Sequence, residues 1–174
     1  MKKFFSLVLA LVMALSLTTV AWGAPVATAD ELKAEISAGK TTIYLADNAN
    51  FRMPSNNTSA TVKIVGNDNN TPVIDMTWGA YWDNATLSFE GVTIKTSTGY
   101  VTSNGTTFGS DYAALYSKNV TYTNCAFVGP MRVGRDGAKF INCTFTELGN
   151  DYVWTYGNDV TFEGCTFNTD GKAI

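Results

Sequence analysis

The residues of this 174-residue chain that are best suited to bind a ligand or catalyse a reaction are aromatic, acidic and basic. They precede each copy of a repeated sequence unit. Aromatic rings stack on sugar rings, and carboxylate or guanidinium groups beside them hydrogen-bond hydroxyl or carboxylate groups. We name this set the aromatic face; its members are Tyr81, Asp83, Tyr112, Tyr116, Arg132, Tyr152, Trp154 and Tyr156. Because exposed aromatic patches commonly mark binding surfaces, the set predicts a shallow saccharide-binding surface.

Alignment of the copies predicts which of these side chains lie above one another. One predicted column contains Tyr81, Ala114, Arg132 and Trp154, and the next contains Asp83, Tyr116 and Tyr156. Two simpler explanations stay open. Tyr and Trp favour strands in general, and the segment 96–109 could fold over the rings.

Two carboxylates on the same face are weak candidates for catalysis. Asp111 and Asp151 align two turns apart, which corresponds to about 9.5 Å at the usual strand spacing and is near the upper limit for an inverting glycosidase. Arg132 would lie close to both and could hold an acidic sugar. The chain shows no clustered carboxylates of the kind that a calcium-dependent lyase needs, and single Asp residues at turn starts more often cap the backbone.

Three cysteines, Cys125, Cys143 and Cys165, occupy one position in successive copies, and Val92 occupies it in the first copy. This pattern favours a ladder of small buried side chains. A disulfide between neighbours is the alternative and would leave one thiol. The chain has no His, so the usual Cys/His metal site is not predicted, and no metal or cofactor is implied.

The element that must position all these residues is an eight-residue unit that occurs four times, with starts 33, 18 and 22 residues apart. The copies are Leu87–Ile94, Val120–Phe127, Ala138–Phe145 and Val160–Phe167. Positions one, three, six and eight are apolar or Cys, which indicates two short strands. The fifth position is always Gly or Asn, namely Gly91, Asn124, Asn142 and Gly164. These types tolerate positive φ best, so they predict a left-handed corner between the strands.

A third strand is predicted upstream of each copy. Its inward residues are expected at Ala80 and Trp82, Ala113 and Leu115, Met131 and Val133, and Val153 and Thr155. Repeats of about twenty residues indicate a solenoid. The predicted fold class is therefore all-β, a right-handed parallel β-helix. A β-sandwich is disfavoured because hairpin signals such as Asn-Gly are nearly absent at the required places.

The flanking segments complete the predicted organisation. Residues 1–23 read as a secretory signal peptide, with Lys2 and Lys3 before an apolar run that is too short to span a membrane. Residues 24–40 form an N-terminal cap, whose helix starts at a capping Asp30, ends at Gly39 and presents Leu32 and Ile36 on one face. Residues 41–174 form the β-helix, with strands over 41–45, 61–66 and 72–76 and projecting loops over 48–60 and 96–109.

The net charge and the two ends of the chain narrow the class of protein that we expect. Without residues 1–23, ten basic and fifteen acidic side chains remain, a net charge of about −5, which disfavours nucleic-acid binding. Residues 172–174 read as the start of another strand, so we expect a fragment of a longer protein. The expected location is secreted or at the cell surface, and no membrane span is expected in the mature chain.

The signal peptide, the helix, the strand at Thr41–Leu45 and the repeated units together resemble the right-handed β-helix, pectate-lyase-like proteins exported by bacteria, over roughly Asp30 to Ile174. The resemblance implies the fold. Its superfamily includes polysaccharide lyases, polygalacturonases and adhesins, among which fold does not choose, and no family catalytic motif carries over. We expect binding of a polysaccharide or cell-surface glycan; the alternatives are a polysaccharide lyase or glycoside hydrolase and a structural stalk or adhesin.

Overall fold

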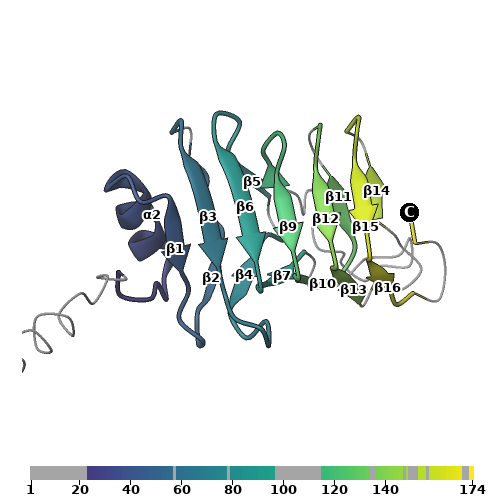
Figure 1. Ribbon diagram of the computed structural model, residues 1–174, viewed down its shortest axis with the longest axis horizontal. Coiled ribbons are helices and arrows are strands. Elements are labelled where there is room, and N and C mark those ends of the chain that lie inside the picture. Colours follow the sequence, from purple (N-terminus) through teal and green to yellow (C-terminus); the bar gives the residue numbers. More distant parts are fainter. Residues whose placement is uncertain are drawn as a thin grey trace, which may run out of the picture.

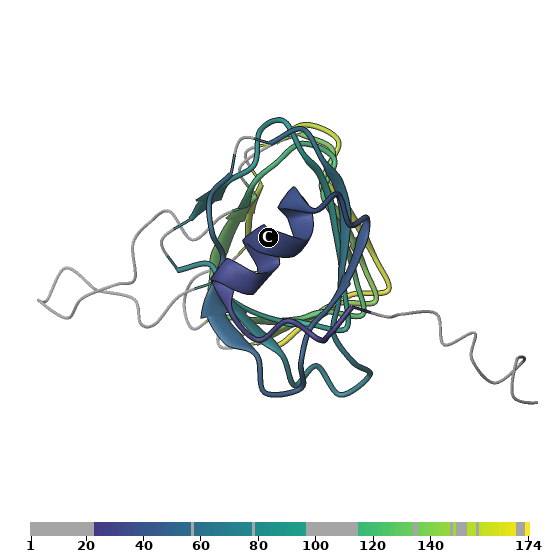
Figure 2. The same cartoon turned by 90° about the vertical axis from the view of Figure 1, so that its left-hand side faces the viewer.

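The computed structural model describes residues 23–56, 58–77, 79–96, 115–133, 136–146, 148, 153–155, 157–169 and 173–174. These residues form a parallel β-solenoid with one short helix at its N-terminal side (Figure 1). Seen along its long axis, the coil is a roughly three-sided tube with the helix across the near end (Figure 2). The predicted fold class is confirmed.

Two six-stranded sheets make two sides of the tube, and every strand pairs in parallel with strands of the neighbouring turns. The first sheet contains β1 (Thr42–Tyr44), β3 (Thr61–Val65), β6 (Thr86–Glu90), β9 (Thr121–Thr123), β12 (Lys139–Ile141) and β15 (Thr161–Glu163). The second contains β2 (Asn50–Arg52), β4 (Val73–Asp75), β7 (Thr93–Lys95), β10 (Ala126–Val128), β13 (Thr144–Thr146) and β16 (Thr166–Phe167).

The third side consists of two short parallel pairs. One is β5 (Ala80–Tyr81) with β8 (Leu115–Tyr116), and the other is β11 (Met131–Val133) with β14 (Val153–Thr155). Figure 1 shows β5, β11 and β14 following one another along this side. The side therefore carries the described part of the aromatic face.

The four predicted copies stack in one register, as the sequence analysis expected. Tyr122 pairs with Phe89 on one side and with Phe140 on the other, and Phe140 pairs with Phe162. The sequence alignment of the copies therefore coincides with the hydrogen-bonded register of the sheet.

The predicted left-handed corner is confirmed in every copy. Gly91, Asn124, Asn142 and Gly164 have φ of 62°, 52°, 51° and 62°. The corners also hydrogen-bond between turns, since the Asn142 amide donates to the Glu163 carbonyl at 2.7 Å. Space is tight here: a Cβ added to Gly164 would collide with Oδ1 of Asn142.

Two stacks of aromatic rings fill the interior from the third copy position and the eighth. Tyr122 and Phe140 stack with centroids 5.1 Å apart, and Phe140 stacks on Phe162 at 4.8 Å. The second stack includes Phe145 and Phe167, whose centroids are 4.7 Å apart. Edge-to-face contacts join the stacks, which makes the core a continuous aromatic array.

The cysteines confirm the predicted ladder over the disulfide, since all three are free thiols. Cys125 and Cys143 are each 1% exposed, and Cys165 is partly buried. Their position is inward, like that of Val92, which is fully buried one turn earlier.

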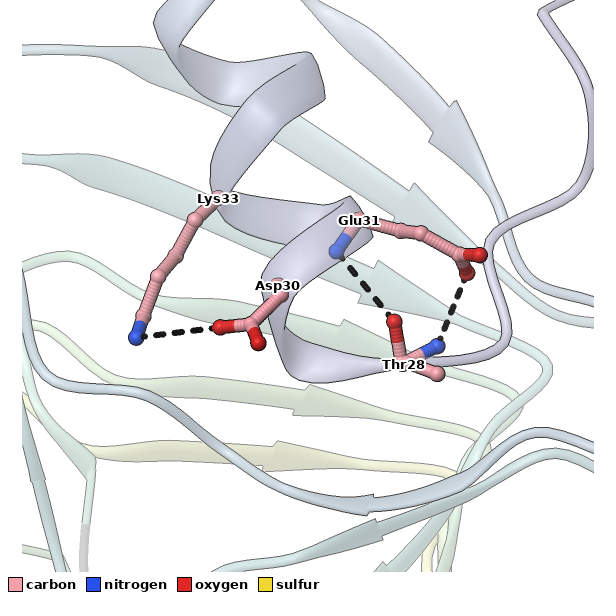
Figure 3. A network of polar contacts seen from close by, with 4 residues as sticks. All are labelled: Thr28, Asp30, Glu31 and Lys33. Carbon is pink, nitrogen blue, oxygen red and sulfur yellow. Dashed lines mark hydrogen bonds and ion pairs between the residues drawn. The ribbon is translucent and has the colours of Figure 1, made fainter.

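The helix α2 (Ala29–Ser37) closes the first turn with buried Leu32 and Ile36, as predicted. Its N-cap is Thr28, however, and the predicted Asp30 cap is wrong, because Thr28 and Glu31 form a reciprocal capping box (Figure 3). Asp30 instead lies in the first turn and contacts Lys33 at 3.6 Å (Figure 3). Gly39 follows the helix at φ 79°, as predicted.

The predicted loop over 48–60 is wrong in part, because β2 lies inside it. Buried Phe51 and Met53 alternate with exposed Arg52, a period of two that the surrounding polar residues obscured in the sequence. The signal-peptide prediction and nearly all of the 96–109 loop lie outside the described residues. Within the described part of the chain, no helix is long and apolar enough to cross a membrane.

Candidate ligand-binding face

Arg132 and Trp154 are neighbours on the third side of the tube. They pair directly across β11 and β14, as predicted, and the guanidinium carbon of Arg132 lies 5.0 Å from the Trp154 ring centroid. Buried Met131 and Val153 point inward from the same two strands, so the alternation of each strand turns Arg132 and Trp154 outward. Both side chains are partly exposed. The arrangement is a cation–π pair held by two rigid strands.

Tyr81 is an exposed aromatic member of the face, with 48% of its surface accessible to solvent. The residues on either side of it, Ala80 and Trp82, are fully buried. The Trp82 indole Nε1 donates to the Pro54 carbonyl at 2.6 Å, which anchors the strand. Tyr81 is therefore presented to solvent by a well-packed backbone rather than by a loose loop.

The register of β5 corrects one of the predicted columns. Tyr81 pairs with Tyr116, and Ala80 pairs with Leu115, so Tyr81 does not align with Ala114 as predicted. The cause is the length of the following segment: six residues lie between Tyr81 and Ser88, whereas only four lie between Tyr116 and Thr121, which pairs with Ser88. The shorter segment turns at Asn119, where φ is 55°. The sequence analysis assumed corners of equal length.

The same shift removes Asp83 from the predicted column with Tyr116. Asp83 lies in the turn after β5, which the hydrogen bond from the Ala85 amide to the Trp82 carbonyl closes at 3.0 Å. Asp83 is exposed and lies beside the aromatic face rather than within its strands. Thr155 is also exposed, although it was predicted to point inward.

Several predicted site residues lie outside the described chain. They are the aromatic candidates Tyr112, Tyr152 and Tyr156 and the catalytic candidates Asp111 and Asp151. Of the predicted set, the structure brings together Arg132 with Trp154 and Tyr81 with Tyr116.

One segment of this side was missed by the sequence analysis. The Tyr81 amide donates to Oγ of Ser55 at 3.1 Å, and the Asn56 amide donates to the Tyr81 carbonyl at 2.9 Å. Residues 54–56 therefore extend the third side by one more turn. The signal that could have revealed them is the Phe51 and Met53 alternation just upstream.

The side chains of this face are suited to non-covalent binding of a ligand. Aromatic rings and a guanidinium supply stacking and hydrogen-bond donors on an outward surface. Among the described residues, no group of three or more His, Cys, Asp or Glu side chains could hold a metal ion.

No protein-family model, no curated protein and no solved structure significantly matches this chain. Function is therefore inferred from the side chains of the third side themselves.

Proposed function

We propose that this protein is exported and binds a polysaccharide or cell-surface glycan through the aromatic face. The observation that carries the proposal is the outward Arg132–Trp154 pair, on the same side of the tube as the half-exposed Tyr81. Exposed rings on rigid strands bind with little loss of side-chain entropy, and their flat faces suit the apolar faces of sugar rings.

The solenoid suits a polymeric ligand better than a small one. Successive turns repeat at about 4.8 Å, so Arg132 and Trp154 on paired strands can contact successive parts of one chain. Several weak contacts on a linear ligand add up to useful affinity when all are engaged together. A surface of this kind needs no deep pocket.

The expected export and the resemblance to pectate-lyase-like proteins support a glycan as the ligand class. An exported acidic protein meets polysaccharides and cell surfaces, and its negative charge disfavours nucleic acid. Binding is preferred over catalysis because the described face offers aromatic and cationic groups that suit non-covalent contact with sugars.

Affinity electrophoresis through gels that contain soluble polysaccharides tests this proposal. Migration of the unaltered protein should be retarded by at least one polysaccharide. Trp154→Ala and Tyr81→Ala should each reduce that retardation, because each removes a stacking surface.

The matched control is Tyr44→Ala. Tyr44 also alternates with a buried residue, Ile43, but it lies on the first six-stranded sheet rather than on the third side. Equal loss in the control would point to a general effect on the coil. Unchanged migration of the Trp154 and Tyr81 variants, or no retardation by any polysaccharide, would favour a stalk that only displays its loops.

A further inference from the structure

The start of the chain offers two positions at which an export signal can be removed. Signal peptidases cut after a segment whose third-last and last residues are small. Residues 21–23 and 27–29 both satisfy this pattern, which allows a cut before Ala24 or before Asp30. The structure describes the chain from residue 23 onward, so it shows which contacts each cut would remove.

The cut before Asp30 would remove part of the first turn of the coil. Val26 is 3% exposed and forms a parallel bridge with Leu45. Its amide donates to the Tyr44 carbonyl at 2.8 Å, and its carbonyl accepts from the Ala46 amide at 2.8 Å. Loss of Val26 would therefore leave two backbone groups beside β1 without their partner, which is unfavourable.

The same cut would remove the N-cap of α2. The Thr28 hydroxyl accepts from the Glu31 amide, and the amides of Ala27 and Thr28 donate to the Glu31 carboxylate at 2.7 and 3.1 Å. A chain that begins at Asp30 has none of these contacts. A chain that begins at Ala24 keeps all of them, because residues 23–25 are exposed and lie outside any helix or strand. The contacts of the first turn therefore favour the cut before Ala24.

The cut before Ala24 also creates a charged group beside α2. A Cβ atom added to Gly23 would lie 3.4 Å from Oε2 of Glu35, so the backbone that precedes Ala24 passes next to this carboxylate. Glu35 is partly buried. Among the residues that the structure describes, none forms an ion pair or a hydrogen bond with its carboxylate.

The position of Glu35 on α2 favours a neighbouring positive charge. Carbonyl groups at a helix C-terminus carry partial negative charge that cations stabilise, and the last turn of α2 has no basic residue. The carboxylates of Asp30 and Glu31 are already engaged, by Lys33 and by backbone amides. An α-ammonium group at Ala24 would supply the missing charge next to Glu35.

We propose that the chain is cut between Gly23 and Ala24 during export and that the new α-ammonium group of Ala24 pairs with the Glu35 carboxylate. This cut requires the proposed export but not the proposed glycan binding. The step is a hydrolysis by a signal peptidase, in which the C–N bond of the Gly23–Ala24 peptide breaks and one water molecule adds across it. Gly23 keeps a carboxylate, and the Ala24 amine takes up the proton that the acid releases.

Expression of the whole chain in a secreting bacterium tests the cut. Intact-mass measurement and N-terminal sequencing of the exported protein should give one species that begins at Ala24. An exported protein that begins at Asp30, or at any other residue, would overturn the assignment and leave the proposed export standing. A chain that keeps Met1 and stays in the cytoplasm would overturn both.

Two variants with the same replacement compare the two possible positions. Gly23→Glu places a large charged residue directly before the proposed cut, so the species that begins at Ala24 should disappear. Ala29→Glu alters only the other position, where an acidic residue suits the first turn of α2, so processing should be unchanged. Loss of the species in Ala29→Glu but not in Gly23→Glu would show that residues 27–29 are the ones recognised.

The acylation rate of the Ala24 amine in the exported protein tests the ion pair, because only an unprotonated amine reacts. Mass spectrometry of the N-terminal peptide gives this rate. An ordinary α-amino group has a pKa of about 8, and a neighbouring negative charge raises it. Glu35→Gln should therefore speed acylation about threefold at pH 7, which corresponds to about half a pH unit. At pH 10 the amine is unprotonated in both proteins, and the rates should converge.

Asp30→Asn is the matched control, because it removes the same charge from the same helix but from a carboxylate that contacts Lys33. Its acylation rate should equal that of the unaltered protein, and circular dichroism spectra of the three proteins should agree. Equal rates for Glu35→Gln and the unaltered protein at pH 7 would overturn the ion pair. A difference that persists at pH 10 would also overturn it, because it would reflect access to the amine rather than charge.

Discussion

The guanidinium of Arg132 lies over the Trp154 ring, with 5.0 Å between the guanidinium carbon and the ring centroid. The two residues pair directly across adjacent turns, so backbone hydrogen bonds fix their approach. One face of the Trp154 ring is thereby taken up by Arg132. A ligand that stacks on Trp154 is expected to use the other face, with Arg132 holding the ring in place.

This pair predicts a measurable coupling in stability. A cation–π contact at a partly exposed site contributes about 0.5–1 kcal/mol, so Arg132→Ala and Trp154→Ala should be non-additive by about that amount. Urea unfolding of the two single variants and the double variant measures the coupling. Strict additivity would mean that the two side chains contribute independently.

Loss of a central ring should be far more costly than loss of a surface residue. Phe140 is fully buried and stacks between Tyr122 and Phe162. Phe140→Ala should lower the free energy of unfolding by about 3–5 kcal/mol, because it removes buried apolar surface and leaves a cavity. Denaturant unfolding followed by circular dichroism checks this. Phe140→Leu, which keeps most of the volume, should cost clearly less; a similar cost would argue against cavity formation.

The left-handed corners should discriminate sharply between Gly and Ala. Asn142 has φ 51°, where an Ala side chain costs about 1–2 kcal/mol. Asn142→Ala should therefore destabilise the protein by about that amount, whereas Asn142→Gly should change stability little, because Gly already serves at the equivalent Gly164. Thermal unfolding compares the two variants, and equal melting temperatures would contradict the corner argument.

Tyr122 should make the protein sensitive to alkaline pH. Burial, reinforced by the nearby Cys125 and Cys143, raises the pKa of Tyr122 above its ordinary value. The phenol of the unfolded chain releases its proton near pH 10, while the folded protein keeps it. The unfolded state then binds fewer protons, so the free energy of unfolding falls as pH rises above about 10.

Denaturant unfolding between pH 8 and 11 measures this effect, with Tyr122→Phe as the matched variant. The variant keeps the stacked ring but has no group to ionise, so its stability should fall less steeply than that of the unaltered protein. Parallel pH profiles for the two proteins would show that Tyr122 does not carry the alkaline sensitivity.

The N-cap of α2 should contribute modestly to the free energy of unfolding, and its contribution can be measured by itself. Thr28 accepts from the Glu31 amide while Glu31 accepts from the Thr28 amide. Thr28→Ala should cost about 1 kcal/mol. Thr28→Ser, which keeps the hydroxyl, is the control, and both are compared by urea unfolding. An equal loss in the two variants would assign the effect to the lost methyl group rather than to the cap.

The repeat and its corners were predictable because they depend on local chemistry. The alternation of apolar and polar residues identified inward residues such as Phe140. The positive φ at the corner allows few residue types, which explains why Asn or Gly stands at positions such as Asn142. The ladder of cysteines followed from the same alignment. These features recur in each turn, so each copy supports the others.

The register of the third side was less predictable because it depends on corner length. Tyr81 pairs with Tyr116 because the chain from Tyr116 to Thr121 is two residues shorter than the chain from Tyr81 to Ser88, the partner of Thr121. Neither corner carries a repeated residue that fixes its length in the sequence. The start of α2 was missed for a related reason, since Thr28 and Asp30 are both good caps and only the reciprocal contact with Glu31 decides between them.

The turns of the solenoid keep one strand register although the number of residues per repeat varies. Copies whose starts are 33 and 18 residues apart in the sequence still stack in the same register. Extra chain can therefore be accommodated between turns while the strand ladder keeps its period. In such a molecule, outward-facing side chains can be exchanged turn by turn while the buried side chains stay the same.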